Sequence, residues 1–214
     1  NDVPMAGHRD NSGVYQTGIE DHLPSSQYSR EEHQNAVVQD IADNWITLSQ
    51  GGKFHAIFAT SCVPEAITYY RLMKVQCPQL RITALFDPHI SDEDNGDDPA
   101  FKTDGLVEIL GDYNASYGQK FDLGSHANFK KDLAARLAHK APYIRIENEP
   151  DKRLDLLIVV NQMLTGFDSK WVNTLYLDKL LAYENIIQAF SRTNRLFGAD
   201  KPFGTIRCYR KPHT

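Results

Sequence analysis

The stretch LLIVVNQMLTGFDSKWVNTLYLDK, residues 156–179, decides the fold class of this chain. It opens on the aliphatic run Leu156–Val160, passes through a polar loop that ends at Asp168, and enters a second apolar segment, Thr174–Leu177. Short apolar runs bounded by polar or glycine-containing loops are typical of buried strands. The stretch therefore predicts two strands joined by a polar loop.

The same alternation extends through most of the chain. Further strands are predicted at Phe54–Thr60, Arg81–Phe86 and Thr205–Tyr209. Helices are predicted from a cap at Ser29 to about Ser49, up to Gln76, over 106–117, from a cap near Ser125 to Leu137, and over Ala182–Phe197. Short apolar strands that alternate with amphipathic helices predict an α/β domain with a mainly parallel sheet covered on both faces.

Length and local composition indicate how the chain is organised. With 214 residues it can form one large domain or two small ones. Residues 1–29 are rich in Gly, Pro, Ser and Asn and are predicted to form an arm or linker, whereas 30–214 are predicted to form the α/β domain, with an acidic surface loop at about 87–104. The sequence begins with Asn1 rather than Met, so we expect a processed chain or a piece of a longer protein.

Composition argues against several protein classes. Leu156–Val160 is far shorter than the roughly 20 residues that a membrane span needs, so no membrane association is expected. The 3 cysteines form no Cys-x-x-Cys pair, which argues against a disulfide framework and a thiolate metal site. No metal site is predicted, and a reducing, cytoplasmic location is the simplest interpretation.

Charge is distributed unevenly. The net charge of −5 disfavours a nucleic-acid-binding protein. However, Asp87–Asp104 carries seven acids against one lysine, and Arg192–Lys211 carries six bases against one aspartate. Because the acidic segment makes the total charge negative, the net charge hides a basic C-terminal segment that a polyanion could contact.

The polar loop before Asp168 is the first candidate site. Ligands in parallel sheets bind outside the carboxyl ends of strands, and this loop leaves such an end. Thr165 offers a hydroxyl, Gly166 allows close backbone approach, and Asp168 could accept hydrogen bonds from ribose hydroxyls. The same residues also suit an ordinary turn, and spacing alone slightly favours the turn.

The predicted helix after the second strand is the other candidate. One face carries the polar residues Gln188, Ser191, Arg192 and Arg195. Arginine guanidinium groups bind phosphate oxygens through paired hydrogen bonds. A solvated helix face is the commoner explanation of such a set, although this face has no Glu or Lys to balance its arginines.

Several phosphate-binding motifs are absent from the sequence. It contains no Gly-x-x-x-x-Gly-Lys-Ser/Thr phosphate loop, no Gly-x-Gly-x-x-Gly and no Gly-x-Ser-x-Gly. The chain is therefore not expected to hold a nucleoside triphosphate and its magnesium ion by itself.

Four segments together resemble a known family: residues 156–161 (LLIVVN), 164–168 (LTGFD), 173–179 (NTLYLDK) and 188–195 (QAFSRTNR). They are similar to the restriction (R) subunit of type I restriction endonucleases, specifically to helicase motifs V and VI of its second RecA-like motor domain. The spacing from Thr-Gly-Phe-Asp to Gln-Ala-Phe-Ser-Arg-Thr-Asn-Arg makes the resemblance specific. Phe54–Thr60 and the helix after it would correspond to motif IV.

The resemblance implies a RecA-like, three-layer domain of the P-loop NTPase type that lacks its own phosphate loop. It also implies an ATP-driven translocase on double-stranded DNA, assembled with modification and specificity subunits. ATP and Mg²⁺ would be bound mainly by the first RecA-like domain of the same subunit.

The resemblance also assigns roles to individual residues. Arg195 would be the arginine finger on the γ-phosphate, with Arg192 as its partner, and Gln188 would orient the triphosphate or the attacking water. Asp168 would contact the ribose. Thr165 and Gly166 would contact the DNA backbone, and Gly166 would also belong to the nucleotide site.

Two departures and two alternatives accompany this interpretation. Ser169-Lys170 stands where several members have Ala-Pro, and the acidic stretch near 92–98 resembles an insertion; both are expected in surface loops. One alternative is the C-terminal domain of a superfamily 2 repair or remodelling helicase. The other is a flavodoxin-like module that binds a phosphate-bearing ligand without catalysis.

Overall fold

The computed structural model describes residues 4–87, 98–160, 167–180, 195, 197–198 and 200–212. Within them the strands are β1 (His8–Arg9), β2 (Tyr15–Gln16), β3 (His55–Thr60), β4 (Ile82–Leu85), β5 (Leu156–Val159), β6 (Val172–Asp178) and β7 (Thr205–Cys208). The α-helices in the same residues are α1 (Glu31–Leu48), α2 (Val63–Gln76), α3 (Pro99–Tyr117) and α4 (His126–Leu137). Short 3₁₀ helices are η1 (Ile19–His22), η2 (Ser25–Gln27), η3 (Leu123–Ser125), η4 (Ile146–Asn148) and η5 (Pro150–Lys152).

Strands β3 to β7 form one sheet in the order β4-β5-β3-β6-β7, with every pairing parallel. β3 lies at its centre, where Ala56 is opposite both Leu156 and Thr174. The predicted α/β class and parallel sheet are confirmed. A flavodoxin-like sheet has its first strand between its second and third. Here the chain returns after α4 and inserts β5 between β4 and β3, so the flavodoxin-like topology is wrong.

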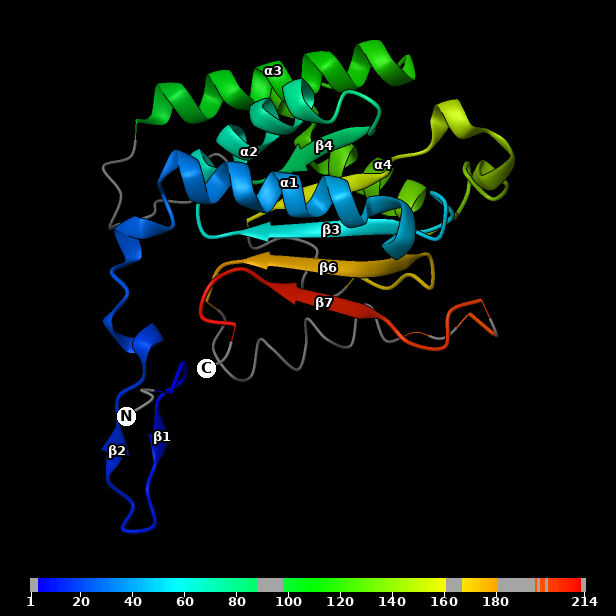
Figure 1. Cartoon of the computed structure of the whole chain (residues 1–214). Coiled ribbons are helices and arrows are strands. Elements are labelled where there is room, and N and C mark those ends of the chain that lie inside the picture. The colour runs from blue at the N-terminus through cyan, green and yellow to red at the C-terminus, as the bar shows by residue number, and fades with distance from the viewer. Residues whose placement is uncertain are drawn as a thin grey trace.

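Helices cover both faces of this sheet, as in a RecA-like three-layer domain. In Figure 1, α1 and α2 lie in front of the sheet, α4 lies behind it, and α3 runs along the edge formed by β4. α3 approaches α2 closely at Gly105, where a Cβ atom would lie 2.4 Å from Cδ1 of Ile67. Any larger residue at this position would force the buried Ile67 side chain to shift.

The core is built on the three central strands. Every residue of β3, β5 and β6 is buried, because helices exclude water from both faces. This explains why β5 is an unbroken aliphatic run rather than an alternating one. Phe58 and Tyr69 meet edge to face at 4.8 Å and join the sheet to α2.

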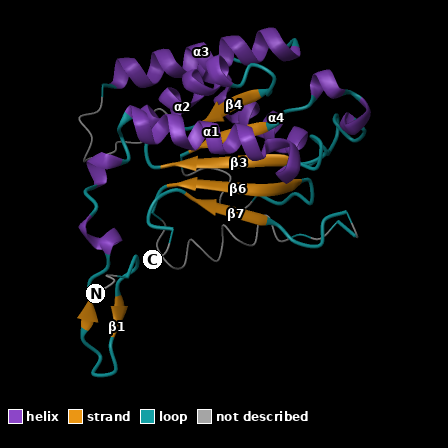
Figure 2. Cartoon of the chain, viewed as in Figure 1, coloured by secondary structure: helices purple, strands orange, loops and turns teal. Residues whose placement is uncertain are grey.

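The N-terminal segment, predicted as an arm or linker, forms a small antiparallel hairpin of β1 and β2. Figure 2 shows this hairpin projecting away from the sheet, with the two 3₁₀ helices η1 and η2 leading from it to α1. The Asp10 carboxylate accepts hydrogen bonds from the Ser12 and Val14 amides and so closes the turn of the hairpin.

Three predicted helix ends differ from the structure. α1 begins at Glu31 with Arg30 as its N-cap, because the extended backbone ends at Arg30 and not at Ser29. α3 begins at Pro99, so residues 99–104, predicted as part of the acidic surface loop, are helical. Ser125 is the N-cap residue of α4 as predicted, and its hydroxyl bonds to the Asp122 carboxylate at 2.6 Å. Arg195 is not helical and Phe197 forms a β-bridge, so the helix predicted over Ala182–Phe197 does not extend to Phe197.

No helix in the described part of the chain is long and apolar enough to cross a membrane.

Candidate functional site

The loop between β5 and β6 connects opposite ends of two parallel strands. Because both strands are parallel, it leaves the carboxyl end of β5 and enters β6 at its amino end. There the His55 amide donates to the Trp171 carbonyl at 2.9 Å, at the point where β3 also begins. Asp168, three residues before Trp171, therefore lies near the amino ends of the parallel strands, here called the amino edge of the sheet. A ligand was expected at the opposite, carboxyl ends of the strands.

Asp168 and Arg195 form an ion pair at this edge. Arg195 Nε lies 2.5 Å from Asp168 Oδ1, and the two side chains are 58% and 44% exposed. The closest contact is made by Nε of the guanidinium group. The structure thus brings together two of the predicted site residues on an accessible surface, from two segments separated by β6.

Aromatic rings hold these two segments against each other. Trp171 stacks on His139 at a centroid distance of 3.9 Å and contacts Phe197 at 4.7 Å. Phe197 also meets Phe54 edge to face at 6.0 Å. Trp171 follows Asp168 by three residues and Phe197 follows Arg195 by two, so this packing fixes the backbone on both sides of the ion pair.

A buried histidine pair lies beneath this aromatic cluster. His55 Nδ1 is 2.5 Å from the Leu154 carbonyl, which can accept but not donate a hydrogen bond, so Nδ1 carries the proton. His55 Nε2 then accepts from His139 Nε2–H at 2.8 Å. Burial is the main cause that lowers the pKa of His55 to about 3 and that of His139 to about 4, whereas the Glu147 carboxylate, 3.2 Å from His139 Nδ1, opposes the shift of His139.

The remaining residues predicted for the site are Thr165, Gly166, Gln188 and Arg192, and they lie outside the described residues. Ser169, expected in a surface loop, is instead buried. Its hydroxyl donates to the Leu137 carbonyl at 2.8 Å and accepts from the Trp171 amide at 3.0 Å. The hydroxyl therefore anchors the segment beside Asp168 to the end of α4.

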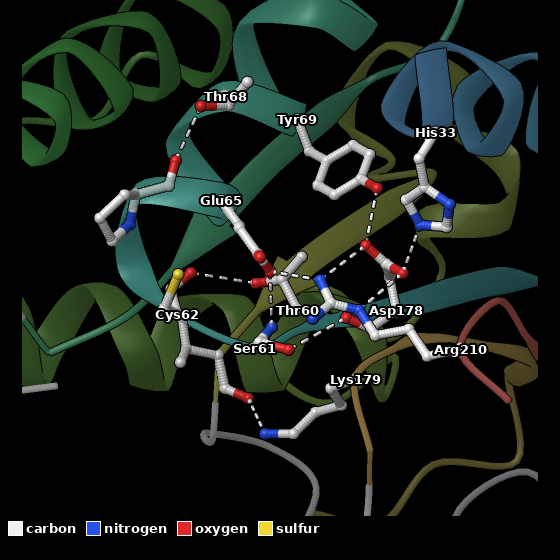
Figure 3. Close-up of polar contacts among 12 residues, drawn as sticks. His33, Thr60, Ser61, Cys62, Glu65, Thr68, Tyr69, Asp178, Lys179 and Arg210 are labelled. Atoms are coloured by element: carbon white, nitrogen blue, oxygen red, sulfur yellow. Dashed lines mark hydrogen bonds and ion pairs between the residues drawn. The ribbon is translucent and has the colours of Figure 1, made fainter. Parts of the chain in front are cut away.

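A second polar cluster lies at the opposite, carboxyl edge of the sheet, around Asp178 at the end of β6 (Figure 3). Its carboxylate accepts hydrogen bonds from Tyr69 Oη at 2.7 Å, from Arg210 Nε at 3.0 Å and, through the ring Nε2, from His33 at 2.8 Å. Arg210 also donates to Glu65 at 2.8 Å. These side chains come from α1, α2, β6 and the segment after β7.

Burial and pairing oppose each other in this cluster. Burial alone raises the pKa of Asp178, but the hydrogen bonds from His33, Arg210 and Tyr69 outweigh it and hold that pKa below its usual value. Burial likewise lowers the pKa of Arg210, yet its contacts with Asp178 and Glu65 raise it overall. The cluster is therefore an ionised, hydrogen-bonded network inside the protein.

Sequence reasoning missed this network because its members are far apart in the chain. The separation is 145 residues for His33 and Asp178 and also for Glu65 and Arg210. A signal was nevertheless present: Asp178 directly follows the apolar run of β6, a position at a strand's carboxyl end.

The basic C-terminal segment is engaged largely with the chain's own groups. Arg195 pairs with Asp168, Arg207 with Asp40 at 2.6 Å, and Arg210 with Asp178 and Glu65. Lys201 is fully buried. Of the described cations in this segment, Arg207 and Arg210 are paired within the chain and Lys201 is buried, whereas Arg195 stays 58% exposed.

Residues 52–211 match the model of the family described as type I restriction enzyme subunit R domain 3. The match covers most of the chain, including the Asp168–Arg195 pair and every member of the Asp178 cluster except His33. The chain belongs to the type I restriction enzyme R subunits. This assignment confirms the resemblance and excludes the alternative of a repair or remodelling helicase.

Curated relatives of this R-subunit domain support the same family assignment. The chain is 34% identical over 180 residues to the type I restriction enzyme SauCOLORF180P endonuclease subunit of Staphylococcus aureus strain COL, covering 81% of this chain and 18% of that protein. A similar protein from Staphylococcus saprophyticus, the type I restriction enzyme SsaAORF53P endonuclease subunit, is 33% identical over 180 residues. This match also covers 81% of this chain and 18% of that protein. The chain thus spans less than a fifth of the curated relatives it matches over most of its length.

A shorter match is closer in sequence. A putative MpnIIP endonuclease subunit N-terminal part from Mycoplasma pneumoniae is 57% identical over 47 residues, which is 22% of this chain and 12% of that protein.

Proposed function

We propose that this chain is the second motor domain of its R subunit and completes an ATP site formed mainly by the first RecA-like domain. The observation that carries the proposal is the exposed Asp168–Arg195 pair, with the two side chains 2.5 Å apart. The absence of a phosphate-loop motif from the sequence further supports a nucleotide site shared with another domain.

The described residues fit a bound nucleotide at this position. The Arg195 side chain is 58% exposed beside Asp168, and a guanidinium group is suited to phosphate oxygens. Asp168 is an acceptor for ribose hydroxyls. In this proposal, ATP with Mg²⁺ supplies the phosphoryl group whose transfer to water drives the motor.

Within that site Arg195 stabilises charge on the transferred phosphate. An arginine placed in this way accelerates related phosphoryl transfers by about 10³–10⁵. Its pairing with Asp168 holds the guanidinium in one orientation before the two domains close. Arg192, Gln188, Thr165 and Gly166 keep the roles that the family resemblance gives them, as partner, triphosphate-orienting and DNA-contacting residues.

The whole subunit would use this site to translocate double-stranded DNA and to cleave unmodified foreign DNA, together with modification and specificity subunits. By itself the chain lacks a phosphate loop and would be inactive as an ATPase. The relatives' description as endonuclease subunits supports this proposal.

The test is DNA-stimulated ATP turnover by the intact R subunit carrying Arg195→Ala. We expect kcat to fall by about 10³ or more with a smaller change in KM for ATP, because the lost interaction is made with the transition state.

Arg71→Ala is the matched control. Arg71 also forms an exposed ion pair, 2.6 Å from Glu108 on the surface of α2 and α3, and its side chain is 45% exposed. We expect Arg71→Ala to keep turnover within about threefold. Equal turnover by the Arg195→Ala and unmodified subunits would overturn the proposal.

A further inference from the structure

Lys201 is a lysine with an unusual environment. It is fully buried, and in the described part of the chain no carboxylate lies within ion-pair distance of it. Its Nζ instead donates to two backbone carbonyls, that of Val172 at 2.6 Å and that of Lys170 at 3.2 Å. These carbonyls flank Trp171, so the ammonium group holds the segment that follows Asp168.

The backbone of Lys201 holds the other half of the ion pair. The Phe197 amide donates to the Lys201 carbonyl at 3.1 Å, which closes a turn directly after Arg195. Through its side chain and its backbone, Lys201 therefore ties the Arg195 segment to the Asp168 segment.

A second contact to the same turn offers a comparison. Lys53 Nζ lies 2.8 Å from Asp200, with side chains 38% and 60% exposed. Exposed pairs of this kind contribute about 0–1 kcal/mol and allow considerable movement. The two buried hydrogen bonds of Lys201 are directional and shielded from water, so they define the position of the turn more strictly.

Stability alone does not explain an ammonium group at this position. Burying a charge without an opposite charge is costly, and an apolar side chain of similar length would fill the same space without that cost. Burial lowers the pKa of Lys201 to about 8, which reflects the same cost. What the ammonium adds is a fixed geometry between two backbone segments.

We propose that Lys201 is a positioning residue for Arg195, setting the guanidinium group at the distance from Asp168 that the nucleotide site needs. The inference rests on the function proposed above. It makes Lys201 act on ATP turnover through Arg195, without contact with the nucleotide.

The test uses the intact R subunit with Lys201→Met, which keeps the volume and removes the donor. We expect kcat of DNA-stimulated ATP turnover to fall by about 10- to 100-fold, because small displacements of a catalytic group have effects of this size. KM for ATP should change less than about threefold. Lys53→Met, which removes the exposed contact to the same turn, should leave kcat within about twofold.

A double variant distinguishes positioning from a general structural role. If Lys201 acts through Arg195, adding Lys201→Met to Arg195→Ala slows turnover by less than about threefold beyond Arg195→Ala alone. Multiplied losses would show an independent role and overturn the inference.

Lys201→Gln covers the case in which the methionine variant does not fold, since its amide retains a donor. We expect it to lower kcat less than Lys201→Met does, and by at least about threefold. Unchanged turnover in the folded Lys201 variants, with Arg195→Ala slow, overturns this inference alone. Unchanged turnover in Arg195→Ala overturns the proposed function itself.

Discussion

The two edges of the sheet each carry an aspartate–arginine pair, and the pairs differ in almost every physical respect. At the amino edge, Asp168 and Arg195 are about half exposed, and the pair joins two loop segments. At the carboxyl edge, Asp178 and Arg210 are 0% and 8% exposed, with further bonds to His33, Tyr69 and Glu65. The same two side-chain types thus occupy opposite environments.

The difference separates a stabilising pair from one that is available to a ligand. The donors and acceptors of the Asp178 network are turned toward one another, so the network joins α1, α2, β6 and the end of the chain. The Asp168–Arg195 pair remains about half exposed, while the half-buried rings of Trp171 and Phe197 and the buried histidines below it provide the rigidity. We expect substitutions at the carboxyl edge to affect folding and those at the amino edge to affect turnover.

The largest expected effect on stability comes from breaking the buried pair. Asp178→Ala leaves the Arg210 guanidinium buried without its main partner and should lower the free energy of unfolding by about 3–5 kcal/mol. Denaturant-induced unfolding followed by circular dichroism measures this change. The double variant Asp178→Ala/Arg210→Met should recover part of the loss, because it removes the uncompensated charge. A loss below about 1 kcal/mol for Asp178→Ala would mean that water reaches this network.

An intermediate effect is expected from the histidine pair under the amino edge. The folded protein holds the pKa of His55 at about 3 and of His139 at about 4, below the usual value near 6.5. The unfolded chain therefore binds more protons as the pH falls below about 6.5, and stability is lost in that direction. Between pH 6.5 and 5 the free energy of unfolding should fall by about 2 kcal/mol per pH unit, about half of it from each histidine.

Variants isolate the histidine contribution from that of other groups. Urea unfolding at several pH values should give a shallower slope for His139→Gln than for the unmodified chain. His8→Gln, at an exposed position of β1, should keep the full slope. Identical slopes for all three proteins would show that the histidine pair is not the origin of the pH dependence.

The smallest expected effect on stability is that of the exposed pair. Arg195→Ala or Asp168→Ala should change the free energy of unfolding by less than about 1 kcal/mol, and the change should shrink further at 1 M salt. Thermal unfolding at low and high salt measures both. A loss comparable to that of Asp178→Ala would erase the distinction between the two edges.

Much of the fold could be predicted from the sequence because burial on both faces leaves a strong pattern. The predicted run Leu156–Val160 is a strand up to Val159, and the apolar segment within β6 is a strand as predicted. Cys77-Pro78 ends α2 as the missing proline amide requires. The cap at Ser29 was wrong because the choice between neighbouring residues depends on backbone angles. Arg30 has extended angles of φ −77° and ψ 147° and so takes the N-cap position.

The candidate site was predictable in part for a different reason. Asp168 and Arg195 were found through their motif, and the structure places them together. The prediction assigned Arg195 to a helix face, whereas it precedes the Phe197–Lys201 turn. Lys201 and Ser169 were missed as anchors because a polar residue in a loop gives no sign of being buried. Their partners are backbone carbonyls, which carry no sequence signal.

The central position of β3 has a consequence for how the chain forms during synthesis. β3 leaves the ribosome early, yet both of its neighbours are made late, since about 100 residues separate Ala56 from its partner Leu156 and still more from Thr174. At about 5–20 residues per second, β3 therefore waits roughly 5–20 s before either neighbour exists. During that interval its six residues, four of them apolar, can be covered by α1 and α2 but not paired in a sheet. Nascent chains of this domain should thus depend on chaperones until β6 has emerged.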